Sequence, residues 1–112
     1  MNTTELEHIA QELDEFLSDQ KNFLSYTGDE PMDYVYGKNS DINRLEIYQT
    51  ITLEQPRKFI KSYRIIIYVN IDGTISIRYR EDNTSIWETT IENFINNHDQ
   101  FLKELITNCN NI

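Results

Sequence analysis

The stretch from Phe59 to Arg80, FIKSYRIIIYVNIDGTISIRYR, most constrains what this chain can fold into. Its central run from Ile65 to Val69 is β-branched or aromatic at every position, which favours a pleated strand. Because the run is apolar at successive positions, it indicates a strand covered on both faces, hence a central one. Asp72 and Gly73 then mark a turn into a second apolar run. The stretch is therefore predicted to form a β-hairpin.

The length of the turn decides which side chains of the hairpin share a face. A two-residue loop at Asp72-Gly73 would set Ile65, Ile67 and Val69 beside Arg80, Arg78 and Ser76. A three-residue loop of Ile71, Asp72 and Gly73, with Gly73 in the left-handed conformation, sets them beside Tyr79, Ile77 and Ile75. Since a one-residue slip turns every side chain to the other face, the apolar match favours the three-residue loop. The opposite face then carries Arg64, Ile66, Tyr68, Ser76, Arg78 and Arg80.

The sequence before the hairpin predicts one helix and one or two strands. The three- and four-residue apolar spacing predicts an amphipathic helix over residues 4–24, and Thr4 with Glu7 fits a capping box. Residues 45–53 alternate between apolar and polar, with Gln49 as the exception, which is typical of a half-buried strand. Residues 32–36 allow a short edge strand, because breakers flank them.

A second amphipathic helix is expected over residues 90–108, with Thr89 and Glu92 as its capping box. Trp87 lies just before it, near enough to pack against its apolar stripe. The tail from Asn108 to Ile112, which includes Cys109, is expected to fray.

These elements predict an α+β fold in a single domain, residues 1–112. An antiparallel sheet of three to four strands would carry an N-terminal and a C-terminal helix packed on it. Two arrangements stay open. Both helices over the face of Ile65, Ile67 and Val69 would leave the arginine face open, whereas one helix on each side would bury Ile66 and Tyr68.

The net charge of −9 is unevenly placed along the chain. Residues 1–54 carry −9, residues 55–80 carry +5 and residues 81–112 carry −5. An acidic surface repels nucleic acid and anionic membranes and attracts basic partners, although it also serves solubility. The arginines of the hairpin are expected to pair internally with the acidic helices, or with a second copy. The longest apolar run has five residues and there is one cysteine, so we expect a cytoplasmic protein without a membrane span.

No pattern of catalytic or metal-binding residues is present, so the chain is expected not to be an enzyme and to hold no cofactor or metal. His8 and His98 are its only histidines, and Cys109 is too far along the helix from His98 to share a metal. His98 is expected at the edge of the core. Nineteen acidic residues make any two carboxylates uninformative as an acid–base pair.

The candidate partner-binding residues are acidic and tyrosine-rich. Tyrosine gives large contact area at low entropic cost, and neighbouring carboxylates suit a basic partner. A surface loop whose tyrosines pack on the core is the alternative interpretation. The candidates are Asp29, Glu30, Asp33, Tyr34, Tyr36 and Asp41, together with Glu12 and Asp19 from the first helix.

These features predict a small inhibitor that neutralises a basic partner protein. The foremost example is a bacterial immunity protein against a nuclease-type toxin, and a phage-type DNA-mimic inhibitor is a related alternative. The chain also resembles secretion-type chaperones in size, charge and its helix-then-strands order, which implies a dimer that binds an extended effector segment. We expect a monomer or homodimer that binds neither nucleic acid nor membrane directly.

Overall fold

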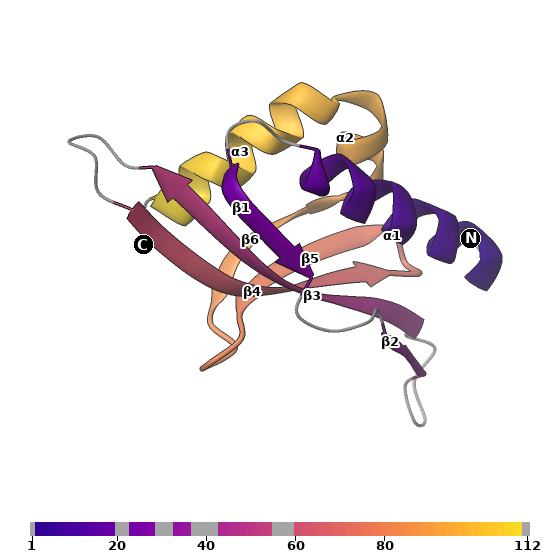
Figure 1. The fold of residues 1–112 in the computed structure, drawn as a ribbon. Coiled ribbons are helices and arrows are strands. Elements are labelled where there is room, and N and C mark those ends of the chain that lie inside the picture. Colours follow the sequence, from indigo (N-terminus) through magenta and orange to yellow (C-terminus); the bar gives the residue numbers. More distant parts are fainter. Residues whose placement is uncertain (1, 20–22, 29–32, 37–42, 55–59, 111–112) are drawn as a thin grey trace.

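The computed structural model describes residues 2–19, 23–28, 33–36, 43–54 and 60–110. This part of the chain forms one antiparallel sheet with helices packed on it, which confirms the predicted α+β fold. Helices α1 (Thr3–Ser18), α2 (Ile91–Asn96) and α3 (His98–Asn110) all lie on the same side of the sheet (Figure 1). None of the helices described is long and apolar enough to span a membrane.

The sheet contains six described strands around β3 and β4. In chain order they are β1 (Phe23–Gly28), β2 (Asp33–Tyr36), β3 (Asn43–Glu54), β4 (Ile60–Asn70), β5 (Thr74–Tyr79) and β6 (Ser85–Thr90). The order across the sheet is β1-β3-β4-β5-β6. Strand β2 also pairs with β3, over residues 43–46, whereas β1 pairs with residues 49–53. The edge strand expected within 32–36 and the strand expected over 45–53 are thus both present.

The hairpin of β4 and β5 has the predicted three-residue loop. Ile65 pairs with Tyr79, Ile67 with Ile77 and Val69 with Ile75. The Gly73 N–H donates to the Asn70 carbonyl at 3.0 Å, and Gly73 has a φ of 98°. Asp72 Oδ1 accepts hydrogen bonds from the backbone N–H and the hydroxyl of Thr74, at 3.0 and 2.7 Å, which fixes the turn.

The N-terminal helix is shorter than the sequence predicts. Helix α1 begins after Asn2, whose side chain accepts from the Glu5 N–H, and it ends at Ser18. Phe23 and Leu24 continue its apolar spacing, but they belong to β1. The prediction of a helix to residue 24 was wrong there, because pairing with β3 satisfies the backbone of this segment.

The C-terminal region also differs in detail from its prediction. Residues 85–90 form β6, which places Trp87 opposite Ile77, and the helix breaks at Asn97 into α2 and α3. Thr90 is the N-cap of α2, one residue after the predicted cap. Helix α3 continues to Asn110, and Cys109 is fully buried, so the expected fraying at Cys109 was wrong.

The core lies between the sheet and its helices. Fully or nearly fully buried side chains come from the inner faces of all three helices and of β3, β4 and β5; they include Leu6, Leu13, Leu17, Ile47, Ile65, Ile67, Val69, Ile75, Ile77, Phe94, Phe101 and Leu105. Of the two arrangements left open by the sequence, the structure has both helices over the face of Ile65, Ile67 and Val69. Ile66 faces the other way, yet is also buried.

Among the residues that the structure describes, one buried amide side chain enters this core. Gln49 interrupts the apolar face of β3 and is only 3% exposed. Its Nε2 donates to Asp14 Oδ1 of α1 at 2.6 Å, whereas its Oε1 has no hydrogen-bond partner within the residues that the structure describes. The pair is therefore a polar link between α1 and the sheet inside an otherwise apolar contact.

We expect Gly73→Ala to lower the free energy of unfolding by about 1–2 kcal/mol, because a Cβ is disfavoured at positive φ. No atom lies within 4 Å of the position a Cβ would take, so the effect comes from the backbone alone. Urea denaturation measures this loss of stability.

Asn83 provides the control, because it is the other described residue in the left-handed region, with a φ of 60°. Asn83→Gly should change stability by less than about 0.5 kcal/mol, and an unchanged midpoint for Gly73→Ala would contradict the expectation.

Candidate functional site

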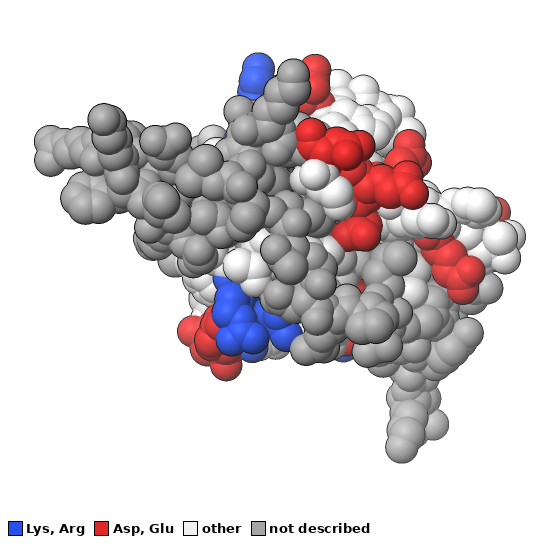
Figure 2. Space-filling view, in the orientation of Figure 1, with Lys and Arg blue, Asp and Glu red and all other residues white. Residues whose placement is uncertain are grey.

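Helix α1 exposes a set of carboxylates, and the helix contains no Lys or Arg to balance them. Its inner side buries Leu6, Ala10, Leu13 and Leu17, so the polar residues between them face outward. The acidic helix surface consists of the exposed residues Glu5, Glu7, Glu12, Glu15 and Asp19. Figure 2 shows acidic side chains gathered over α1, whereas a group of basic side chains lies on the opposite side, beneath the sheet.

The helix dipole of α1 stabilises the acids near its N-terminus and destabilises those near its C-terminus. Glu5 lies in the first turn, where the helix dipole stabilises a negative charge. Glu15 and the C-cap Asp19 lie at the other end, where the dipole disfavours one, and the last turn holds no basic residue. Glu15 and Asp19 are also four residues apart, a spacing at which like charges repel. Helix stability therefore does not account for the acids at the C-terminal end.

The structure describes five of the eight candidate partner-binding residues. Glu12 and Asp19 are exposed on α1, seven residues apart and hence on one side of the helix. Asp33, Tyr34 and Tyr36 lie in β2, where Asp33 pairs with Glu46, Tyr34 with Leu45 and Tyr36 with Asn43. The structure thus places these three on the edge of β3. Asp29, Glu30 and Asp41 lie outside the described residues, and their role stays a prediction.

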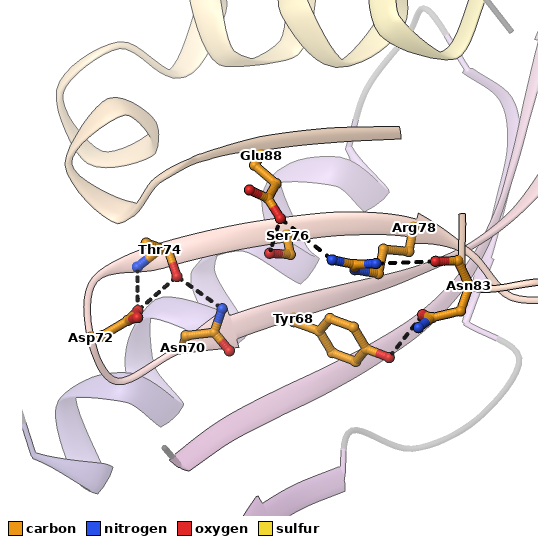
Figure 3. A network of polar contacts seen from close by, with 8 residues as sticks. All are labelled: Tyr68, Asn70, Asp72, Thr74, Ser76, Arg78, Asn83 and Glu88. Carbon is orange, nitrogen blue, oxygen red and sulfur yellow. Dashed lines mark hydrogen bonds and ion pairs between the residues drawn. The ribbon is translucent and has the colours of Figure 1, made fainter. Parts of the chain in front are cut away.

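The sheet face opposite the helices is the second polar surface. We call it the arginine–tyrosine face; it consists of Arg44, Tyr48, Arg64, Tyr68, Arg78 and Arg80. Arg78 contacts Glu88 of β6 at 3.5 Å and donates to the Asn83 carbonyl at 3.1 Å (Figure 3). Arg64 lies 3.5 Å from Glu81. The predicted internal pairing of the arginines is therefore present, but their partners lie on strands and in the turn after β5, not on the helices.

A partly buried cluster of Arg44, Glu46 and Tyr48 lies at one end of this face. Glu46 Oε1 accepts from Arg44 Nε and Nη2 at 3.0 and 2.9 Å, and its Oε2 accepts from the Tyr48 hydroxyl at 2.5 Å. The guanidinium of Arg44 also lies 4.3 Å from the ring centre of Tyr68. Sequence reasoning missed this cluster. Its signal was the two-residue spacing of Arg44, Glu46 and Tyr48, which places all three on one face of a strand.

Shallow hollows adjoin this cluster. One of about 350 Å³ is lined by Arg44, Tyr68, Ser76, Arg78 and Asn83, and a neighbouring one of about 420 Å³ shares Tyr68 and Asn83 with it. Within the network of Figure 3, Tyr68 and Arg78 both contact Asn83, and Ser76 contacts Glu88. Because Arg44, Arg64 and Arg78 each have a carboxylate partner, this face is largely neutralised from within.

His98 and Cys109 lie at opposite ends of α3. His98 begins α3, with its ring 4.4 Å from Phe94 and 5.0 Å from Phe16, and its Nε2 lies 3.9 Å from Glu12 Oε1. It is half-exposed, which confirms the prediction of a core-edge histidine. In the described part of the chain, no three His, Cys, Asp or Glu residues converge to hold a metal ion.

Two ionisable groups near the turn after β5 have shifted pKa values. Burial, and next the neighbouring Tyr63, raises the pKa of Tyr79 above its usual value. The Thr84 N–H donates to Asp82 at 2.9 Å and lowers the pKa of that carboxyl, which keeps it charged.

The chain matches no protein-family model, no curated protein and no solved structure.

Glu15→Gln should raise the free energy of unfolding by about 0.3–1 kcal/mol, because it removes a negative charge from the end of α1 where the dipole disfavours it. Glu5→Gln is the matched control, with the same chemical change in the first turn, and should lower stability by a similar amount. Urea denaturation in low salt measures both, and 1 M NaCl should shrink both effects. Equal signs for the two variants would contradict this account.

Glu46→Gln should lower the free energy of unfolding by about 1.5–3 kcal/mol, because it weakens charge-assisted hydrogen bonds from Arg44 and Tyr48 in a buried position. The Glu46 side chain is 10% exposed, whereas that of Glu88, which also pairs with an arginine, is 61% exposed. Glu88→Gln should therefore change stability by less than about 1 kcal/mol. Chemical denaturation of the two variants measures the difference, and equal losses would be inconsistent with it.

Proposed function

We propose that this chain is a small inhibitor that binds a basic partner protein through the acidic helix surface, as an immunity protein does against a nuclease-type toxin. The observation that carries the proposal is the placement of exposed acids at the C-terminal end of α1, where they oppose the stability of the helix. Residues that weaken a fold without serving its packing are typical of functional surfaces.

The chemistry of a nuclease supports this kind of partner. An enzyme that binds nucleic acid presents Lys and Arg side chains to phosphates. Carboxylates on a rigid helix can occupy the places of those phosphates, and the net charge of −9 speeds the encounter. The acidic helix surface suits this task better than the arginine–tyrosine face, whose charges are largely paired within the chain.

The tyrosines of β2 extend the proposed interface. Tyr34 and Tyr36, with Asp33, Asp29, Glu30 and Asp41, would supply aromatic contact area beside carboxylates, the composition of binding hot spots. The proposed role is binding alone, with the chain acting on its partner by covering its basic site.

Retention of the partner should depend on where the acids lie, and not only on total charge. The double variant Glu12→Gln/Asp19→Asn and the control Glu81→Gln/Asp99→Asn each remove two negative charges, from −9 to −7. All four residues are exposed. Tagged chains are used to capture basic proteins from the cells that produce this chain, at 50 and 500 mM NaCl. Wild type and control should retain the same basic protein in low salt, and the α1 variant should retain at least about tenfold less.

The captured protein is then expressed alone and together with each variant. We expect it to arrest growth alone, wild type and control to restore growth, and the α1 variant to restore it less. Equal rescue by both double variants, or a captured protein without toxicity, would overturn the proposal.

A further inference from the structure

A hollow lies between the turn of the β4–β5 hairpin and helix α2. Asp72 lines both this hollow and the one of about 350 Å³ on the arginine–tyrosine face. The hollow between the turn and α2 has a volume of about 510 Å³, and we call it the hairpin notch. Its walls are formed by Asp72 and Gly73 of the turn and by Ile91, Glu92, Ile95 and Asn96 of α2. Two segments that are separate in the sequence thus line an open hollow at the end of the sheet.

The two walls of the notch are tied together. The Ile91 N–H donates to the Gly73 carbonyl at 2.8 Å, which joins the start of α2 to the turn. The turn is itself fixed by the hydrogen bonds from Thr74 to Asp72, and the Thr90 hydroxyl caps α2 through the Asn93 N–H at 3.0 Å. The notch is therefore preformed, so a ligand would not have to order it.

The lining combines an apolar floor with two carboxylates. Ile95 is 47% exposed and is the one large apolar side chain exposed among the residues that the structure describes. Asp72 and Glu92, both exposed, stand on opposite walls. The hydrogen bonds that Asp72 accepts from Thr74 both go to Oδ1, so a ligand could donate to Oδ2 without displacing them.

We propose that the hairpin notch receives an arginine side chain of the basic partner protein. The three methylenes of arginine would lie on Ile95 and Ile91, as long cationic side chains lie along apolar surface. The guanidinium would donate to the carboxylates of Asp72 and Glu92, whose planar geometry it matches. A purely apolar side chain would leave two carboxylates partly desolvated, and an anion would be repelled.

This inference rests on the proposed function, because the basic partner supplies the arginine. It adds a second contact, distinct from the acidic helix surface, and it names the chemistry of that contact. Arginine is enriched among the residues that dominate binding energy at interfaces, especially where it fills a pocket.

The test is an NMR titration of the ¹⁵N-labelled full chain with N-acetyl-L-arginine amide. N-acetyl-L-citrulline amide, which has nearly the same shape without the charge, is the matched probe. Arginine should give saturating shifts at the backbone amides of Gly73, Glu92 and Ile95, and citrulline should not. Absence of shifts at these amides, or equal shifts with both probes, would overturn the proposal.

Variants locate the site. Glu92→Gln and Asp72→Asn should each weaken binding of the arginine probe roughly two- to fivefold, the usual range for an exposed charge pair. Asp72→Asn keeps the oxygen that accepts from Thr74, so the turn should stay intact. Asp99→Asn, the same change at an exposed acid of α3, should leave the affinity for the probe unaltered.

The capture experiment separates this inference from the proposed function. If Glu92→Gln retains the partner as well as wild type while the α1 double variant loses it, the notch proposal fails and the proposed function stands. If the arginine probe binds at the notch but the α1 double variant keeps its partner, the notch stands as an arginine site and the proposed interface on α1 fails.

Discussion

The pairing of Ile67 with Ile77 decides the character of both faces of the sheet. With the three-residue turn closed by Gly73, the aliphatic side chains of β4 and β5 lie together under the helices. A slip of one residue would direct Arg78 into that core and Ile77 to the outside, and a buried unpaired guanidinium is far more costly than an exposed isoleucine. The helices, the core and the outward arginines thus all depend on the length of one turn.

The same alternation explains why an acidic chain has a basic segment. The outward residues of β3, β4 and β5 include arginines whose charges lie near Glu46, Glu81 and Glu88. Positive charge in the sheet is therefore largely balanced within the sheet. The last turn of α1 holds no basic residue, so the acids at that end of the helix have no such balance on their own helix.

The sequence allowed the hairpin, its register, the strands around residues 33–36 and 43–54 and the α+β class to be predicted, because local apolar patterns and turn residues determine them. The end of α1 could not be placed, since Phe23 and Leu24 fit the helical spacing as well as a strand, and only pairing with β3 decides between the two. Strand β6 is short and polar in four of its six residues, so its pairing with β5 was not visible locally.

The candidate site was predictable only in part. The exposed acids of α1 follow from its apolar stripe, whereas the Arg44–Glu46–Tyr48 cluster and the hairpin notch depend on contacts between distant segments. The notch joins residue 73 to residue 91, and no pattern within either segment predicts the other.

The hydrogen bond between Gln49 and Asp14 has a consequence for α1 as a whole. Apolar contacts between a helix and a sheet are non-directional, so they define the position of the helix less specifically than a hydrogen bond does. Within the described part of the chain Gln49 Oε1 has no hydrogen-bond partner, so losing the contact with Asp14 would leave both polar atoms of this buried amide unpaired there. The Gln49 amide thereby favours a single position of α1 on the sheet. The carboxylates on the outer side of α1 consequently keep a fixed position relative to the strands.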